Sequence, residues 1–201
     1  MVKLSKAFYF WSYISAEVIS FILNLNMPFE PGKDAMEWTN PIFIISTLFS
    51  IYCGIVMSVF IYKTWKLIPI SYARTTPGKA VGFSFIPFYD FYWTFQTIYG
   101  WTKDFNKTVR NLEKNWDKAP ETFGLVVSIV SVIVVFVILI NNYNPWVKIS
   151  FKIINILSYV NITLFAIYMS KICDVINSIE SKEILNGSRL GKQAGRKTRR
   201  T

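Results

Sequence analysis

Histidine is absent from this chain of 201 residues, and cysteine occurs only twice. Without histidine there is no imidazole for acid–base catalysis or for metal binding. Two cysteines are too few for a zinc cluster or a disulfide framework. Charged residues make up 17% of the chain, whereas a typical soluble domain has about 25%. These shortages favour a protein that is not an enzyme, and we expect no metal and no cofactor.

Long apolar runs are abundant, since 52% of the residues are hydrophobic and the mean hydropathy is +0.33. A helix needs roughly 20 apolar residues to cross a bilayer. Four runs reach or approach this length, at residues 7–27, 42–62, 123–140 and 153–172. A soluble helix of this length would show a polar face. The sequence therefore predicts an all-α integral membrane protein with four transmembrane helices in one membrane domain, residues 1–180.

A fifth stretch, residues 80–102, is apolar but differs in kind, because ten of its residues are aromatic. Pro87 interrupts it and glycines border it. Tyrosine and tryptophan prefer the headgroup level of a bilayer. Three placements follow from this composition: the stretch spans the membrane, dips in and returns, or lies in the interface.

The distribution of basic residues favours a stretch that does not cross. Basic residues near the ends of spans mark the cytoplasmic side. With both termini inside and residues 80–102 not crossing, 19 basic residues lie inside and 3 lie outside. A crossing would place the basic cluster of residues 103–118 outside. We therefore expect a multi-pass protein of a bacterial inner membrane with both termini in the cytoplasm.

Residues 103–118 show the pattern of an amphipathic helix. Four apolar residues recur at helical spacing, and four basic residues have the same spacing, shifted by two positions. The apolar residues are Phe105, Val109, Leu112 and Trp116, and the basic residues are Lys103, Lys107, Arg110 and Lys114. Such a helix lies on an anionic membrane surface. The pattern predicts one long interfacial helix over residues 88–116 that contacts anionic lipids, with packing of the apolar stripe on the protein itself as the alternative.

Residues 76–93 read TPGKAVGFSFIPFYDFYW. This string resembles a segment of uncharacterised bacterial multi-pass membrane proteins, some of which carry a small GYF-like domain in front. The resemblance covers about 32 residues, 75–106, and implies a membrane location without a function. That pattern often has asparagine where this chain has Asp90. We therefore expect Asp90 to accept hydrogen bonds from the backbone or from Lys79, not to be the centre of a mechanism.

Glu17 lies in the middle of the first apolar run. An ionisable residue at this depth faces protein or water and is a functional candidate. It either joins helices through hydrogen bonds or handles ions or protons. Candidate partners are Ser12, Asn24, Asn155 and Asn161. We favour the joining role.

The C-terminal residues 181–201 are rich in lysine and arginine and contain three glycines, which predicts a flexible basic cytoplasmic tail. Anionic lipid is the expected partner of the tail. Nucleic acid is not favoured, because no aromatic residues alternate with the basic ones.

Two functions fit the sequence. The first is a non-enzymatic component of a membrane complex, or an immunity-type membrane protein, that binds itself or other membrane subunits. The second is a small oligomeric ion channel or transporter that uses Glu17. No internal repeats of the transporter kind are present, and we favour the first.

Overall fold

The computed structural model describes residues 4–25, 41–143, 149 and 151–197, and every regular element within them is helical. The long helices are α1 (Lys6–Leu25), α2 (Pro41–Trp65), α6 (Glu121–Tyr143) and α7 (Phe151–Lys197). Shorter elements lie between α2 and α6: α3 (Pro77–Gly82), η1 (Phe83–Phe85), α4 (Tyr89–Thr94), η2 (Phe95–Gly100) and α5 (Trp101–Asn111). The predicted all-α class is thus confirmed for this part of the chain.

Three helical segments are long and apolar enough to cross a membrane: Pro41–Trp65, Glu121–Asn141 and Ile153–Ile179. They coincide with the second, third and fourth predicted runs. The first run forms α1, a helix of 20 residues, but it is not among these three segments. Glu17 and several serines make α1 more polar, and residues 26–27 of the run lie outside the described residues. A fourth crossing stays a prediction.

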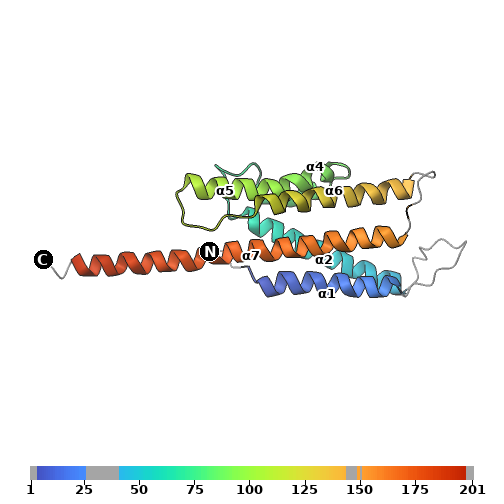
Figure 1. Cartoon of the computed structure of the whole chain (residues 1–201), viewed down its shortest axis with the longest axis horizontal. Helices are drawn as coiled ribbons and strands as arrows, with labels where there is room; N and C mark the ends of the chain where they lie inside the picture. The colour runs from blue at the N-terminus through green and yellow to red at the C-terminus, as the bar shows by residue number, and fades with distance from the viewer. Residues whose placement is uncertain (1–3, 26–40, 144–148, 150, 198–201) are drawn as a thin grey trace, which may run out of the picture.

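The helices form an elongated bundle (Figure 1) in which α1 packs on α2 and α7, and α6 packs on α7. Tyr9 of α1 meets Phe60 of α2 edge to face, with ring centroids 5.4 Å apart. At one end of the bundle, Leu4 exchanges two hydrogen bonds with the Asn177 side chain of α7. The start of α1 is therefore fixed beside the last third of the spanning part of α7.

Helix α7 is longer than the predicted fourth span. It continues to Lys197 and projects beyond the other helices (Figure 1). Its backbone is helical through residues 181–197, where the glycines predicted a flexible tail. The residues between the glycines are mostly lysine, arginine, glutamine, leucine and alanine, all good helix formers.

Helix α5 ends earlier than predicted. The sequence pattern extended one helix to Trp116, but the helix stops at Asn111. The Glu113 amide donates to the Arg110 carbonyl, and the Lys114 amide donates to the Val109 carbonyl at 3.1 Å. Together with the positive φ of 49° at Glu113, these two bonds form a Schellman motif. The prediction of a helix over residues 103–118 is wrong beyond Asn111 because this motif turns the chain.

Candidate functional site

Residues 77–111 form a helical hairpin, which we call the aromatic hairpin. Its first arm is α3 with η1, and its second arm is the continuous run of α4, η2 and α5. Thr76 caps α3 by accepting a hydrogen bond from the Lys79 amide, and Pro77 occupies the first turn. The indole N–H of Trp93 joins the two arms by donating to the Ala80 carbonyl at 2.9 Å.

The hairpin reverses at residues 86–88, which we call the tip. Pro87 removes one backbone donor, and Phe88 has a φ of 65°, a conformation that is costly for an aromatic residue. The Asp90 amide reaches back across the tip to the Ile86 carbonyl at 3.2 Å. The tip is therefore a tight non-helical turn between two helical arms.

The second arm runs antiparallel to α6. Near the start of α6, a Cβ on Gly124 would lie 3.2 Å from the Thr102 side chain, so glycine permits close packing there. Further along, the ring of Phe91 lies 5.0 Å from the ring of Phe136. The 12 residues between Gly124 and Phe136 correspond to about 18 Å of helix. The hairpin thus reaches well along α6, while α6 continues past the tip to Tyr143.

One turn of α5 holds both ends of the segment that contains the hairpin. Asp104 binds Arg74, which precedes the first arm. Asn106 binds Ala119, just before α6, through its side-chain amide in both directions, at 2.7 and 2.8 Å. Residues 74 and 119 therefore lie at the same end of the bundle. The chain enters and leaves this segment on one side.

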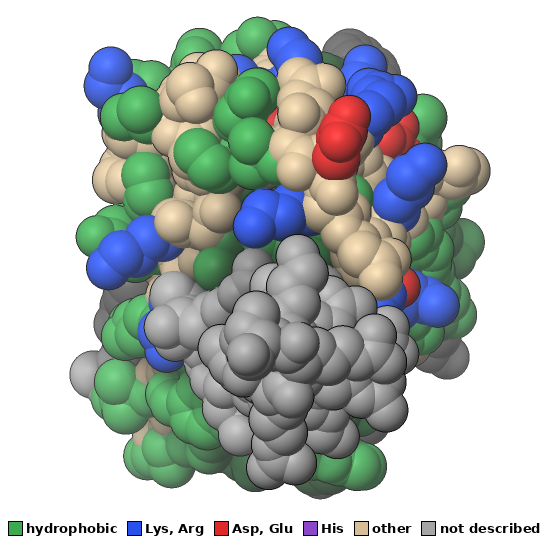
Figure 2. Space-filling model, turned by 90° about the vertical axis from the view of Figure 1, so that its left-hand side faces the viewer, with side chains coloured by type: hydrophobic (Ala, Val, Ile, Leu, Met, Phe, Trp, Pro, Cys, Tyr) green, Lys and Arg blue, Asp and Glu red, His purple; other side chains and the backbone are tan. Residues whose placement is uncertain are grey.

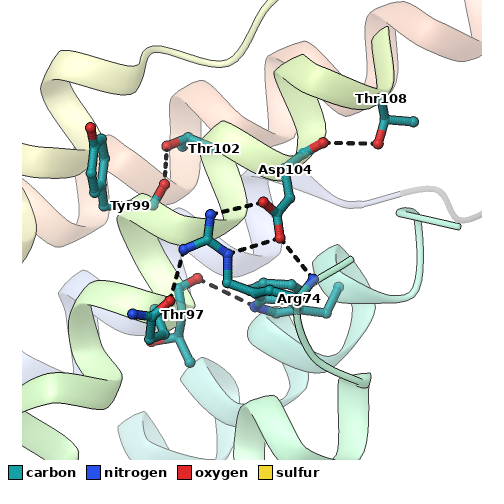
Figure 3. A network of polar contacts seen from close by, with 8 residues as sticks. Arg74, Thr97, Tyr99, Thr102, Asp104 and Thr108 are labelled. Carbon is teal, nitrogen blue, oxygen red and sulfur yellow. Dashed lines mark hydrogen bonds and ion pairs between the residues drawn. The ribbon is translucent and has the colours of Figure 1, made fainter. Parts of the chain in front are cut away.

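The contact between Arg74 and Asp104 is fork-shaped (Figure 3). The Arg74 side chain donates through Nε and Nη2 to the two carboxylate oxygens, at 2.9 and 2.8 Å, and its backbone amide adds a third bond at 2.9 Å. Its remaining nitrogen, Nη1, donates to Gln96. The hydrogen bonds to Asp104 raise the pKa of Arg74. Gly100 leaves room for this guanidinium, because a Cβ there would lie 2.9 Å from Nη1.

The second arm contains a π-helical segment, η2, which includes Thr97 and Ile98. Two of its carbonyls accept hydrogen bonds from other helices. The Trp65 indole donates to the Thr97 carbonyl at 3.3 Å, and the Tyr168 hydroxyl donates to the Ile98 carbonyl at 3.1 Å. These two bonds anchor η2 to α2 and α7. π-Helical turns often occur at functional sites, which makes this arm of the hairpin a candidate site.

The tip is exposed although it is apolar. Phe85 is 72% exposed and Phe88 is 80% exposed. Beside the tip, a groove of about 490 Å³ lies between the hairpin and α6. Val135 and Leu139 of α6 line this groove, together with Asp90. The hairpin thus presents an uncovered aromatic surface next to an open groove.

Basic side chains gather at the end of the bundle where α5 lies. Figure 2 views this end and shows lysine and arginine side chains spread around it, with few acidic ones. Besides Arg74 with Asp104, ion pairs at this end join Lys6 with Asp174 at 2.7 Å and Lys182 with Asp117 at 2.6 Å. The three basic residues expected on the opposite side are Lys33, Lys148 and Lys152, and the structure does not describe the side chain of any of them.

The apolar stripe of α5 packs on the protein itself. Phe105 and Val109 are 1% and 5% exposed, and the Phe105 ring stacks with the rings of Trp101 and Trp116, with centroids 5.0 and 6.3 Å away. For Phe105 and Val109 the membrane-surface interpretation is therefore wrong, because α5 turns these side chains into the core. Leu112, at 37% exposure, lies outside the helix. The basic side of the pattern is exposed, at Lys103, Lys107, Arg110 and Lys114.

Glu17 is half-buried in α1. One turn earlier, the Cys53 thiol of α2 donates to the Tyr13 carbonyl of α1 at 3.8 Å. Two of the partners expected for Glu17 are engaged elsewhere: Ser12 donates to the Phe8 carbonyl, and Asn161 accepts a hydrogen bond from Ser131 at 2.8 Å. The side chain of Asn24, a third expected partner, is not among those that the structure describes. Asn161 thus joins α7 to α6 instead of to α1.

Two other predicted residues do not join this network. Asn155 is partly buried in α7. Asp90 is half-buried beside the tip and lines the groove there. The expected hydrogen bonds to its side chain, from the backbone or from Lys79, are not among the contacts of the described residues. The intramembrane polar candidates therefore do not converge on one site.

The sequence analysis missed the residues that organise the hairpin, namely Arg74, Gln96, Asp104 and Asn106. Arg74 and Asp104 are 30 positions apart, so no local periodicity pairs them. One signal was present in the sequence: Asp104 and Asn106 flank Phe105, a residue of the apolar stripe. In the structure all three are buried. Polar residues next to an aromatic residue of the core are buried with it, and buried polar groups require hydrogen bonds. Asp104 and Asn106 are therefore expected to bind other groups of the same protein.

In the described residues, no group of three or more cysteine, aspartate or glutamate side chains could hold a metal ion. Comparison with protein-family models, with curated proteins and with solved structures gives no match.

Proposed function

We propose that the protein is a non-enzymatic, multi-pass membrane protein that acts as an assembly or interaction component of a membrane complex, with the aromatic hairpin as its contact surface. In this proposal α1, α2, α6 and α7 cross a bacterial inner membrane. The hairpin enters from the cytoplasmic side and returns to it, and both termini are cytoplasmic.

The observation that carries the proposal is the exposed, non-helical tip beside α6. Lipid offers no hydrogen bonds, so non-helical backbone at membrane depth is tolerated only where protein or a water-filled cavity covers it. The tip lies next to Val135 and Leu139, in the later part of a helix that is apolar enough to span. Phe85 and Phe88 nevertheless stay uncovered by this chain. A partner that packs on the tip and fills the groove would supply the missing cover.

The aromatic content of the tip suits such a contact. Aromatic side chains are enriched where one protein docks on another, because they bury a large area at a small cost in conformational entropy. The hairpin itself is held firmly by Asp104, by Asn106 and by the bonds to η2. A rigid support with an exposed aromatic end is the arrangement expected of a docking element.

Site-specific photo-crosslinking tests the proposal. A photoreactive phenylalanine analogue replaces Phe88 in cells that produce the full-length protein, and crosslinked products are extracted in mild detergent. We expect a protein adduct whose mass identifies either a second copy of this chain or another membrane protein. Leu48 on α2, which is 59% exposed, is the matched control, where only lipid adducts are expected.

Only lipid adducts at Phe88, at the same yield as at Leu48, would contradict the proposal. The double variant Phe85→Ser/Phe88→Ser gives a second test. It should shift the protein to a smaller particle in size-exclusion chromatography while leaving it in the membrane. An unchanged particle size would also contradict a docking role for the tip.

A further inference from the structure

A second groove lies on the other side of the first arm, between α3 and α2. Its volume is about 560 Å³, within the range of clefts that hold small ligands. Two glycines of α3, Gly78 and Gly82, line the groove on one side, opposite side chains of α2. Neither glycine has another side chain within reach of an added Cβ, so the floor of the groove is open.

The groove is apolar along its length and basic at one end. Val59 and Val81 provide the apolar wall, and Lys63 and Lys66 stand in and just beyond the last turn of α2. Val59 and Lys66 are seven residues apart, which corresponds to about 10 Å along the helix axis. This order, with apolar walls toward the bundle and cations toward its basic end, matches the order of acyl chain and headgroup in a phospholipid.

The two cations are open to an anionic ligand. Within the described part of the chain, neither Lys63 nor Lys66 forms an ion pair with a carboxylate. The Lys63 ammonium lies 5.8 Å from the Tyr9 ring centroid, a contact that leaves its charge uncompensated. Tyr62, which is 45% exposed, adds a hydroxyl at the level that tyrosine prefers in bilayers.

We infer that this groove is a binding site for one anionic phospholipid, distinct from the docking surface at the hairpin tip. An acyl chain lies over Gly82 between Val59 and Val81, and the headgroup phosphate lies between the ammonium groups of Lys63 and Lys66. The site goes beyond a general attraction of the basic end for anionic membranes, because it requires a particular groove and two particular lysines.

Native mass spectrometry of the full-length protein in detergent micelles, with phosphatidylglycerol or phosphatidylcholine added, tests this inference. Wild type should retain one phosphatidylglycerol and bind phosphatidylcholine at least fivefold more weakly. Gly82→Leu should lower phosphatidylglycerol retention at least fivefold by filling the groove. Lys63→Gln/Lys66→Gln should remove the preference for the anionic lipid. Ala7→Leu adds three carbons at an exposed position of α1, against four for Gly82→Leu, and should retain the lipid as wild type does.

The variant Gly82→Ala shows whether a loss of lipid comes from a blocked groove or from misfolding. Alanine favours the helix and adds one carbon, so this variant should keep the wild-type melting temperature and lose only part of the lipid. Equal retention of the two lipids by wild type, or full phosphatidylglycerol retention by Gly82→Leu, would overturn the inference. Neither result would affect the crosslinking outcome at Phe88, because the tip and this groove share no residue.

Discussion

Removal of the Arg74 side chain should loosen the hairpin from its support. Arg74→Ala deletes two charge-assisted bonds to Asp104 and leaves a carboxylate that is only 10% exposed. A hydrogen bond to a charged group contributes about 1.5–3 kcal/mol. Because 36% of the Arg74 side chain is exposed, water offsets part of the loss. We expect a destabilisation of about 2–3 kcal/mol.

The two cysteines provide the assay. Cys53 and Cys173 are free and only 4% and 0% exposed, so a thiol-reactive fluorescent dye reports unfolding of the core in detergent. For a chain of this size, 2–3 kcal/mol corresponds to about 5–10 °C in melting temperature. The matched control is Lys107→Ala, which removes an exposed positive charge from α5 and should change the melting temperature by about 2 °C or less.

A double-mutant cycle isolates the pair. Arg74→Ala and Asp104→Ala should not add, and their coupling should be in the range of about 0.5–3 kcal/mol found for contacting residues. Two results would refute the view that this ion pair fixes the hairpin. One is a melting temperature of Arg74→Ala equal to that of Lys107→Ala, and the other is full additivity of the destabilisations caused by Arg74→Ala and Asp104→Ala.

Three further outcomes are expected. Tyr168→Phe removes the hydrogen bond to the buried Ile98 carbonyl and should lower the stability by about 1–2 kcal/mol. The melting temperature should then fall by a few degrees in the same assay, and an unchanged melting temperature would mean that η2 needs no such anchor. Purified protein in liposomes should conduct no cations. Glu17→Gln should leave assembly unchanged, because glutamine can still form an interhelical hydrogen bond, which contributes only about 0.6 kcal/mol. Cation flux through the wild-type protein that Glu17→Gln abolishes would support a channel instead. The hydrogen bond from Lys182 lowers the pKa of Asp117, so its stabilising effect is complete above the unfolded pKa of about 3.9 and is lost as the pH falls through the folded value. The melting difference between wild type and Asp117→Asn should therefore narrow below about pH 4, and a constant difference would exclude the linkage.

The sequence predicted the long helices well, because length and apolar content decide them directly. Runs 42–62, 123–140 and 153–172 lie within α2, α6 and α7. The helical backbone of α1 was also expected, although its crossing stays a prediction. These elements are specified by local composition, without reference to distant residues.

The details of the hairpin could not be predicted in the same way. The helical spacing of Phe105 and Val109 fits either a lipid surface or a protein core, and only the position of Trp101 and Trp116 decides between them. The end of α5 depends on a positive φ at Glu113, which is uncommon for glutamate. The pairing of Arg74 with Asp104 depends on the tertiary path of the chain. The pairing joins residues 30 positions apart, and the other two features depend on backbone and side-chain geometry that composition and spacing do not specify.

The central claim is that the hairpin returns to the side from which it starts, and thiol labelling tests it most directly. Single cysteines replace Lys66 and Asn111, both exposed, in a background without Cys53 and Cys173. A membrane-impermeant maleimide is added to intact cells and to inside-out vesicles. We predict that Lys66→Cys and Asn111→Cys are both labelled in the vesicles and neither in intact cells. Labelling of the two positions from opposite sides of the membrane would contradict the account.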